Sequence, residues 1–310
     1  MHNPRSKRLT LIAFVVSTFL VGNNPIAVRY SNAELPPFFG AAIRFAAASL
    51  LLFLVVLALR LPFPRGRSLL GVLVIGVLQF GVNYALLYRS LLHVQAGLVS
   101  VILALGPLLT FFVAMAHRQE AFQWRVLIGG LLAVGGIAIV FRHELSASVP
   151  LMPMLAVILS SACVAEASIL FKSLPKAHPV TTNALAMATG AAILFAMSWL
   201  WHETPRLPTL PTTWIAFSYL VLFGSVGVFV LALYVLARWP ASTAAYQAVL
   251  MPIVTIPFAA WLAQETVTVE FLIGVTLALI GVCVGAVIPA NIMDRFLPPL
   301  HRRKASISSK

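Results

Sequence analysis

The chain has 310 residues, of which 61% are hydrophobic and 9% charged, and its formal net charge is +13. A soluble domain carries about 25% charged residues, so this chain could not cover a water-facing surface, and most of its exterior must face lipid. The positive charge does not indicate a nucleic-acid-binding protein, because the Lys and Arg residues lie between apolar runs rather than along one helix face. The composition predicts an all-α integral membrane protein.

Ten apolar runs follow one another along the chain, each close to the roughly 20 residues that a spanning helix needs. In chain order they are residues 9–28, 37–59, 69–88, 94–116, 124–141, 151–171, 180–201, 213–236, 241–263 and 269–290. The first run is longer than the core of a signal peptide, so we expect it to be retained as a helix. The connectors are too short for a separate soluble domain. The pattern predicts ten transmembrane helices.

The Lys and Arg residues of the connectors predict the orientation. If the runs span in alternation, sixteen of these residues share one side: Arg5, Lys7, Arg8, Arg60, Arg65, Arg67, Arg118, Arg125, Lys172, Lys176, Arg238, Arg295, Arg302, Arg303, Lys304 and Lys310. The other side has four: Arg29, Arg89, Arg142 and Arg206. Since cytoplasmic connectors carry the excess of basic residues, we expect both termini in the cytoplasm and the chain in the cytoplasmic (inner) membrane.

One segment of the sequence occurs twice. Residues 96–136 align without a gap with residues 241–281 at a constant offset of 145, which pairs Pro107 with Pro252. We therefore divide the chain into a first half, residues 1–145, and a second half, residues 146–310, which ends in a basic cytoplasmic tail. Each half holds five spans, an odd number, so the second half enters the membrane in the opposite sense. Such inverted repeats are typical of secondary transporters, whose substrate site forms where the halves meet.

Several residues together match the sequence pattern of a known protein family. They are the Arg44-Phe45 pair, Pro107, Pro252, Glu120, Glu265, and the glycine pairs Gly129 with Gly136 and Gly274 with Gly281. With them the chain, from Thr10 to Ala290, resembles the EamA-type carriers of the drug/metabolite transporter superfamily. The resemblance implies ten helices around a central cavity lined by spans one to four and six to nine. It also implies transport of small metabolites, often amino acids.

The chain departs from the family pattern in two places. The first span has Val21-Gly22-Asn23-Asn24 where Trp-Gly is common in the family. The offset of 145 places Thr189 opposite Arg44, so the second half lacks the matching arginine. We infer that the two halves have specialised.

Two ionisable residues, Arg44 and Glu166, stand well inside predicted spans, where such groups are costly and need an explanation. Arg44 could bind a substrate carboxylate, since its planar fork matches that group, or it could cap backbone carbonyls. Glu166 could carry protons during the transport cycle, or it could hydrogen-bond to a neighbouring helix. Their depths differ by about 10 Å along the membrane normal, so we expect each to have its own partners.

Further polar residues sort into the same two depths. On the third span, Gln79 and Asn83 share a face, as expected for a cavity wall. The candidate substrate-binding residues are Asn23, Arg44, Gln79, Asn83, Tyr84, Ser100, Thr189, Tyr246 and Gln247. Interhelical hydrogen bonds are the alternative use of the amides among them.

Prolines and glycines predict how the helices are shaped and packed. Pro107 and Pro252 lie in the middle of spans four and nine, where we expect them to kink the helix. Gly residues line one face of spans five and ten, which predicts close helix packing. That packing could lie within the monomer or form a homodimer through span five or ten.

These features favour a secondary carrier over the other classes. We expect it to move a small metabolite, an amino acid or related compound, by alternating access in the direction of export, driven by the substrate gradient or by protons. The expected partners are the substrate and the lipid bilayer, without nucleic acid. The alternatives are a facilitator, a channel or scramblase, and a membrane-embedded transferase. No phosphate-binding glycine loop, paired carboxylates or metal-ligand spacing occurs, so we expect no enzyme activity, cofactor or metal.

Overall fold

The computed structural model describes residues 4–118, 124–146, 151–173, 177–236, 238–239 and 241–287. Helices occupy most of these residues, and no strand occurs among them. The first-half elements are α1 (Pro4–Ser31), α2 (Pro37–Ala58), α3 (Arg67–Ile75), η1 (Gly76–Val82), α4 (Asn83–Ser90), α5 (Ala96–Leu103), α6 (Gly106–Ala116) and α7 (Trp124–Ser146). The second-half elements are α8 (Leu151–Ser173), α9 (Pro179–Leu200), α10 (Pro211–Val221), η2 (Leu222–Gly227), α11 (Val228–Leu236), α12 (Ala241–Leu262), α13 (Val269–Val282) and η3 (Cys283–Val287).

The helices match the predicted apolar runs in order and position. Within the described residues, seven helices are long and apolar enough to cross a membrane, at residues 8–31, 37–58, 67–90, 96–116, 151–171, 179–200 and 211–232. Three shorter apolar helices cover Val126–Val140, Gln247–Leu262 and Val269–Gly285. The prediction of an all-helical protein with many apolar spans is thus confirmed, and the number of ten crossings stays a prediction.

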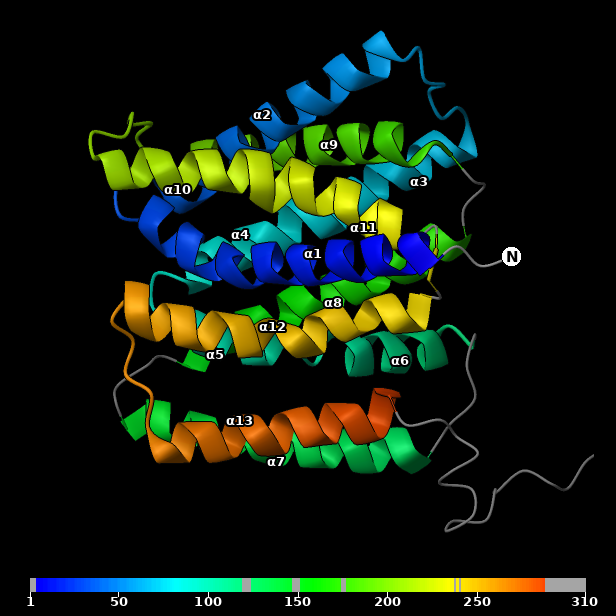
Figure 1. Ribbon diagram of the computed structural model, residues 1–310. Coiled ribbons are helices and arrows are strands. Elements are labelled where there is room, and N and C mark those ends of the chain that lie inside the picture. The colour runs from blue at the N-terminus through cyan, green and yellow to red at the C-terminus, as the bar shows by residue number, and fades with distance from the viewer. Residues whose placement is uncertain are drawn as a thin grey trace, which may run out of the picture.

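The two halves pack against each other in a pattern that repeats under the offset of 145. α1 packs on α12, and its counterpart α8 packs on α5 and α6, the counterparts of α12. α2 packs on its own counterpart α9, and α7 packs on its own counterpart α13 (Figure 1). The contacts in these last two pairs run antiparallel: Phe38 meets Trp201, whereas Ser49 meets Ala184. An approximate two-fold relation that reverses helix direction therefore connects the halves.

The glycine faces of the fifth and tenth runs are used inside the chain. A Cβ atom at Gly136 on α7 would lie 2.5 Å from the carbonyl oxygen of Gly274 on α13, and one at Gly281 would lie 2.6 Å from that of Gly129. Both distances are too short for any side chain, so glycine lets the two backbones touch. The glycine faces of α7 and α13 are therefore covered within the monomer. A homodimer through span five or ten stays a prediction, and it would have to use other faces of these two helices.

Two π-helical segments sit at matching places in the halves. η1 interrupts the helix that continues as α4, and η2 interrupts the helix that continues as α11. Moving residues 76–82 by the offset of 145 gives 221–227, which coincides with η2. π-helical turns widen a helix and leave its carbonyls poorly paired, so they are frequent at functional sites.

Candidate functional site

Arg44 lies fully buried on α2, at the contact between the two halves. Its Nε donates to Ser225 Oγ at 3.0 Å, its Nη1 to Tyr88 Oη at 3.2 Å and its Nη2 to the Gly224 carbonyl at 3.1 Å. Gly224 and Ser225 belong to η2 of the second half, whereas Tyr88 belongs to α4 of the first. The arginine therefore joins three helices across the interface. We call these four residues, with Asn24 and Tyr84, the Arg44 cluster.

Aromatic rings surround the guanidinium group, and a matching carboxylate is lacking among the described residues. Its central carbon lies 4.9 Å from the ring centre of Phe45 and 5.2 Å from that of Tyr84, within cation–π range. In the described part of the chain, Arg44 forms no ion pair with Asp or Glu. A guanidinium has five N–H groups, and the three bonds described use three of them. The cluster thus buries a positive charge that retains donors for an anionic group.

The π-helical turn makes the Gly224 carbonyl available to two donors. Asn24 of α1 donates from Nδ2 to this oxygen at 3.2 Å, alongside the bond from Arg44. A Cβ atom at position 224 would overlap Asn24 Oδ1, so any side chain there would displace this amide from its place in the cluster. Asn24 Oδ1 itself is buried and accepts no hydrogen bond from the described residues. The cluster therefore also holds a free acceptor beside its cation.

The candidate residues predicted from the sequence fall in several places. Tyr84 joins the Arg44 cluster, whereas the Nδ2 of Asn83 donates to the backbone carbonyl of Gln79 at 2.9 Å. That Gln79 and Asn83 share a face as a cavity wall stays a prediction. The hydroxyls of Ser100 and Thr189 donate to carbonyls of their own helices, at Gly97 (2.6 Å) and Leu185 (2.9 Å).

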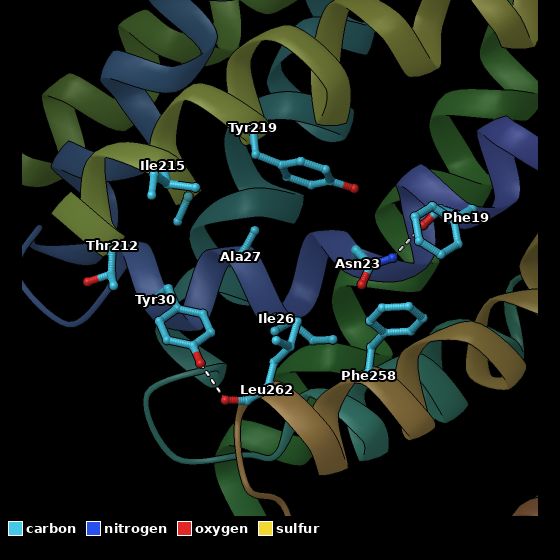
Figure 2. A pocket seen from close by; sticks show the side chains of 11 residues that line it. Phe19, Asn23, Ile26, Ala27, Tyr30, Thr212, Ile215, Tyr219, Phe258 and Leu262 are labelled. Carbon is cyan, nitrogen blue, oxygen red and sulfur yellow. Dashed lines mark hydrogen bonds between the residues drawn. The ribbon is translucent and has the colours of Figure 1, made fainter.

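Three further candidates lie on α1 and α12. Asn23 lines a groove beside α1 (Figure 2). The Nε2 of Gln247 is buried and finds no acceptor among the described residues. The Tyr246 side chain lies outside the described residues. Whether these positions bind substrate stays a prediction.

Sequence reasoning missed Asn24, Tyr88 and Ser225 as members of the cluster. Asn24 carried a signal, because two adjacent asparagines before Pro25 in an apolar run are unusual enough to ask for partners. Ser225 and Tyr88 carried little signal, since a serine after a glycine and a tyrosine near a span end are common in membrane helices.

Glu166 on α8 pairs with His117, the residue that follows α6. The His117 Nε2 lies 3.0 Å from both carboxylate oxygens of Glu166, and both side chains are partly exposed. Arg44 and Glu166 therefore have separate partners, as predicted. The pair connects α8 to the end of a helix that is interrupted nearby: α5 ends at Leu103 and α6 begins at Gly106, with Pro107 in its first turn. α12, in contrast, continues through the matching Pro252.

At the opposite end of the bundle, three glutamates cap helices across the two halves. We call it the carboxylate end; it carries the α1–α2, α9–α10 and α12–α13 connections and lies on the left in Figure 1. Glu203 accepts from the backbone N–H groups of Phe38 and Phe39 at the start of α2, at 3.1 and 2.8 Å. A carboxylate at this position satisfies unpaired N–H groups and complements the helix dipole.

Glu265 makes the same kind of contact with α5 and adds an ion pair. It accepts from the N–H groups of Ala96 at 2.6 Å and Gly97 at 2.9 Å, and it pairs with Arg29 at the end of α1. Glu265 therefore caps a helix that begins 169 residues away in the sequence. Glu120, its counterpart, lies outside the described residues.

Glu34 of the first half caps α10 of the second. It accepts from the N–H groups of Thr209 and Leu210, both at 3.0 Å, and from the Thr209 hydroxyl. The hydroxyls of Thr209 and Thr213 and these N–H groups lower the pKa of Glu34 from 4.5 to about 2. All three carboxylates thus bond to a helix of the other half, which fastens the halves together at this end.

Comparison with known proteins agrees with this architecture. The profile of the EamA-like transporter family matches residues 8–142 and again residues 151–286. The uncharacterized inner membrane transporter YedA of Escherichia coli strain K12 is 24% identical over 297 residues, which cover 94% of this chain and 93% of YedA. The biotin transporter of Salmonella typhimurium strain LT2 is 26% identical over 226 residues, 70% of each chain. A solved crystal structure shares the fold with a TM-score of 0.63 at 16% identity, covering 94% of this chain and 99% of the other.

A helical chain with apolar spans, two repeated halves and a polar cluster between them is a membrane transporter. Both repeats match one family over most of the chain, and the chain belongs to the EamA-like transporter family. The resemblance seen in the sequence is therefore confirmed.

Proposed function

We propose that the chain is a secondary transporter that carries a small metabolite across the cytoplasmic membrane by alternating access. In this proposal, the seven long and three shorter apolar helices form ten crossings, both termini lie in the cytoplasm, and the carboxylate end faces outward. The observation that carries the proposal is the direction-reversing pairing of α2 with α9 and of α7 with α13. Inverted halves let one central site open to either face by rocking.

The Arg44 cluster is the proposed substrate site. Arg44 has donors to spare and no carboxylate partner among the described residues, and Asn24 Oδ1 lacks a donor. A carboxylate and a nearby donor on one small molecule, as in an amino acid, would complement both groups. The central cavity would form around the cluster when α2 and η2 separate.

Each end of the bundle is one gate of the proposed transporter, and contacts between the halves hold both ends. At the carboxylate end, Glu34, Glu203 and Glu265 bond across the halves, so this gate is shut. At the other end, the His117–Glu166 pair fastens α6, which follows a break in span four. Protonation of Glu166 would release this fastening, which would couple the inner gate to a proton gradient in the direction of export.

The proposal is tested with the full chain in proteoliposomes. A panel of amino acids and small carboxylates, with biotin included because of the Salmonella relative, is followed by mass spectrometry with and without an imposed pH gradient. We expect gradient-dependent accumulation of at least one solute by the wild type, and exchange without accumulation by Glu166→Gln. Glu270→Gln, an exposed carboxylate at the start of α13, is the matched control and should behave as wild type.

Each other outcome changes the assignment. Equal transport with and without the gradient would make the protein a facilitator and Glu166 a packing residue. Unitary currents in planar bilayers would show that the protein is a channel and not a carrier.

A further inference from the structure

A groove of about 400 Å³ runs along α1 between α10 and α12, and none of the Arg44 cluster residues lines it. Its volume lies within the range of about 300–1,000 Å³ that is typical of small-molecule sites. α1 forms its floor with residues from Phe19 to Tyr30, α10 one wall with Ile215 and Tyr219, and α12 the other with Phe258 (Figure 2).

The groove opens toward the lipid. On α1, Ile12, Val15 and Phe19 are exposed apolar residues spaced three or four apart, and Asn23 and Ile26 continue the same helix face into the groove. In a membrane protein such an apolar stripe faces the hydrocarbon. Ile215, at the rim, is 69% exposed. A ligand can therefore enter from the bilayer without passing through the interface of the two halves.

The amide of Asn23 offers the groove a hydrogen-bond acceptor. The Nδ2 of Asn23 donates to the Phe19 carbonyl at 2.8 Å, and since a carbonyl can only accept, the amide oxygen must face the other way. No donor among the described residues bonds to this oxygen. At hydrocarbon depth there is little water to satisfy it.

Two backbone carbonyls of the floor are already paired with side chains of neighbouring helices. Pro25 lacks an N–H group and interrupts the α1 hydrogen-bond pattern, and side chains from neighbouring helices bond to the carbonyls before it. Tyr219 donates to the Leu20 carbonyl at 2.7 Å, and Thr255 donates to that of Gly22 at 2.6 Å. The Asn23 oxygen is a further acceptor, which no described side chain uses and which a ligand could bond.

The residues that line the groove also indicate the charge and the ring character of the ligand. None of the described residues that line the groove carries a charge, so a charged ligand would be costly to bury there. The rings of Phe19 and Phe258 stand edge to face with centres 5.3 Å apart, and Tyr219 faces them across the amide. Aromatic walls of this kind favour an aromatic guest.

We propose that this groove binds an uncharged aromatic molecule that carries one O–H or N–H donor, which enters from the bilayer and bonds to Asn23 Oδ1. A phospholipid acyl chain lacks this donor and would leave the oxygen unpaired. The site stands whether or not the Arg44 cluster binds a transported solute.

The test uses the full chain in phosphatidylcholine nanodiscs without any gradient. The probe is an aryl diazirine with a benzylic alcohol, compared with its methyl ether and with the corresponding carboxylate. After irradiation, mass spectrometry locates the adducts. We expect adducts on α1, α10 and α12, with the alcohol labelling about two- to tenfold more than the ether, as one hydrogen bond allows, and little labelling by the carboxylate.

Variants separate recognition from simple partitioning. Asn23→Leu should label equally with alcohol and ether. Ala27→Phe on the floor and Ala216→Leu on the wall, both buried groove residues, should each lose labelling. Ala192→Phe, on an exposed face of α9, is the control and should keep it. Two blocking variants, one on the floor and one on the wall, are used so that a folding defect in one leaves the other informative.

Three results would overturn the proposal. They are equal labelling by alcohol and ether in the wild type, adducts spread over lipid-facing residues of α7 or α13, and a retained phospholipid that blocks the probe. Because the binding assay needs no gradient, its failure is distinct from a failure of transport in proteoliposomes.

Discussion

Two contacts between the halves are related by the sequence repeat, but they are built from different side chains. In one contact α9 packs on η1, and in the other α2 packs on η2. At the first, Gly190 lies so close that an added Cβ would overlap Phe80, and one at Gly76 would lie 2.7 Å from the Ala186 carbonyl. At the second, the counterpart of Thr189 is Arg44, whose long side chain reaches Ser225 and the Gly224 carbonyl of η2.

This difference assigns separate tasks to duplicated elements. The α9–η1 contact is nearly backbone to backbone, so it resists separation. The α2–η2 contact depends on hydrogen bonds to a buried cation, which a ligand or a conformational change can exchange for others. We expect the first contact to hold the halves together and the second to change during transport.

The largest effect should come from breaking the tight contact. Gly190→Leu forces a side chain into the space of Phe80, and we expect it to destabilise the fold by about 3 kcal/mol, the upper end of overpacking costs. Thermal unfolding in detergent measures this loss. Gly106→Leu, at a helical glycine with open space around it, should cost less. Equal losses in the two variants would contradict the distinction between the contacts.

Breaking the polar contact should impair transport more strongly than it lowers the stability of the fold. Arg44→Gln leaves Tyr88 and Ser225 without their donor and removes the charge, and we expect transport to fall about 10- to 100-fold. Arg44→Lys keeps the charge and should lose less if a carboxylate is bound. Proteoliposome uptake gives the rates, and size-exclusion chromatography reports folding. The same loss of folded protein in both variants would make the arginine purely structural.

The closure at the carboxylate end, which we propose to face outward, can be weakened without changing either contact. Glu265→Gln removes the ion pair with Arg29 and weakens the cap of α5, a change worth about 0.5–2 kcal/mol. In a background without Cys163 and Cys283, Asn83→Cys should then react about two- to thirtyfold faster with an external, membrane-impermeant thiol reagent. Glu270→Gln should leave the rate unchanged. Equal rates in all three backgrounds would place Asn83 away from the outer path.

The smallest effect should be a pH dependence from Glu34. Because its pKa is lowered from 4.5 to about 2 in the folded state, its stabilising contribution is complete above pH 4.5 and is lost as the pH falls toward 2. The external reactivity of Asn83→Cys, corrected for the reagent's own pH dependence, should stay constant from neutral pH to pH 5 and rise below 4.5. Glu34→Gln should abolish that rise. A rise already at neutral pH would exclude this carboxylate as its cause.

The sequence by itself determined the helices, the two halves and the family. Apolar length predicts a span whatever it packs against, and the offset of 145 carries the repeat without any coordinates.

The tertiary structure decided which side chains meet. Arg44 finds Ser225 at a separation of 181 residues, Glu265 finds Ala96 at 169, and Glu166 finds His117 at 49. The groove at Asn23 likewise requires α10 and α12 to flank α1. No local sequence pattern determines such partners, because they depend on how the inverted halves are rotated against each other. They also depend on which helix faces are covered by other helices and which face the lipid.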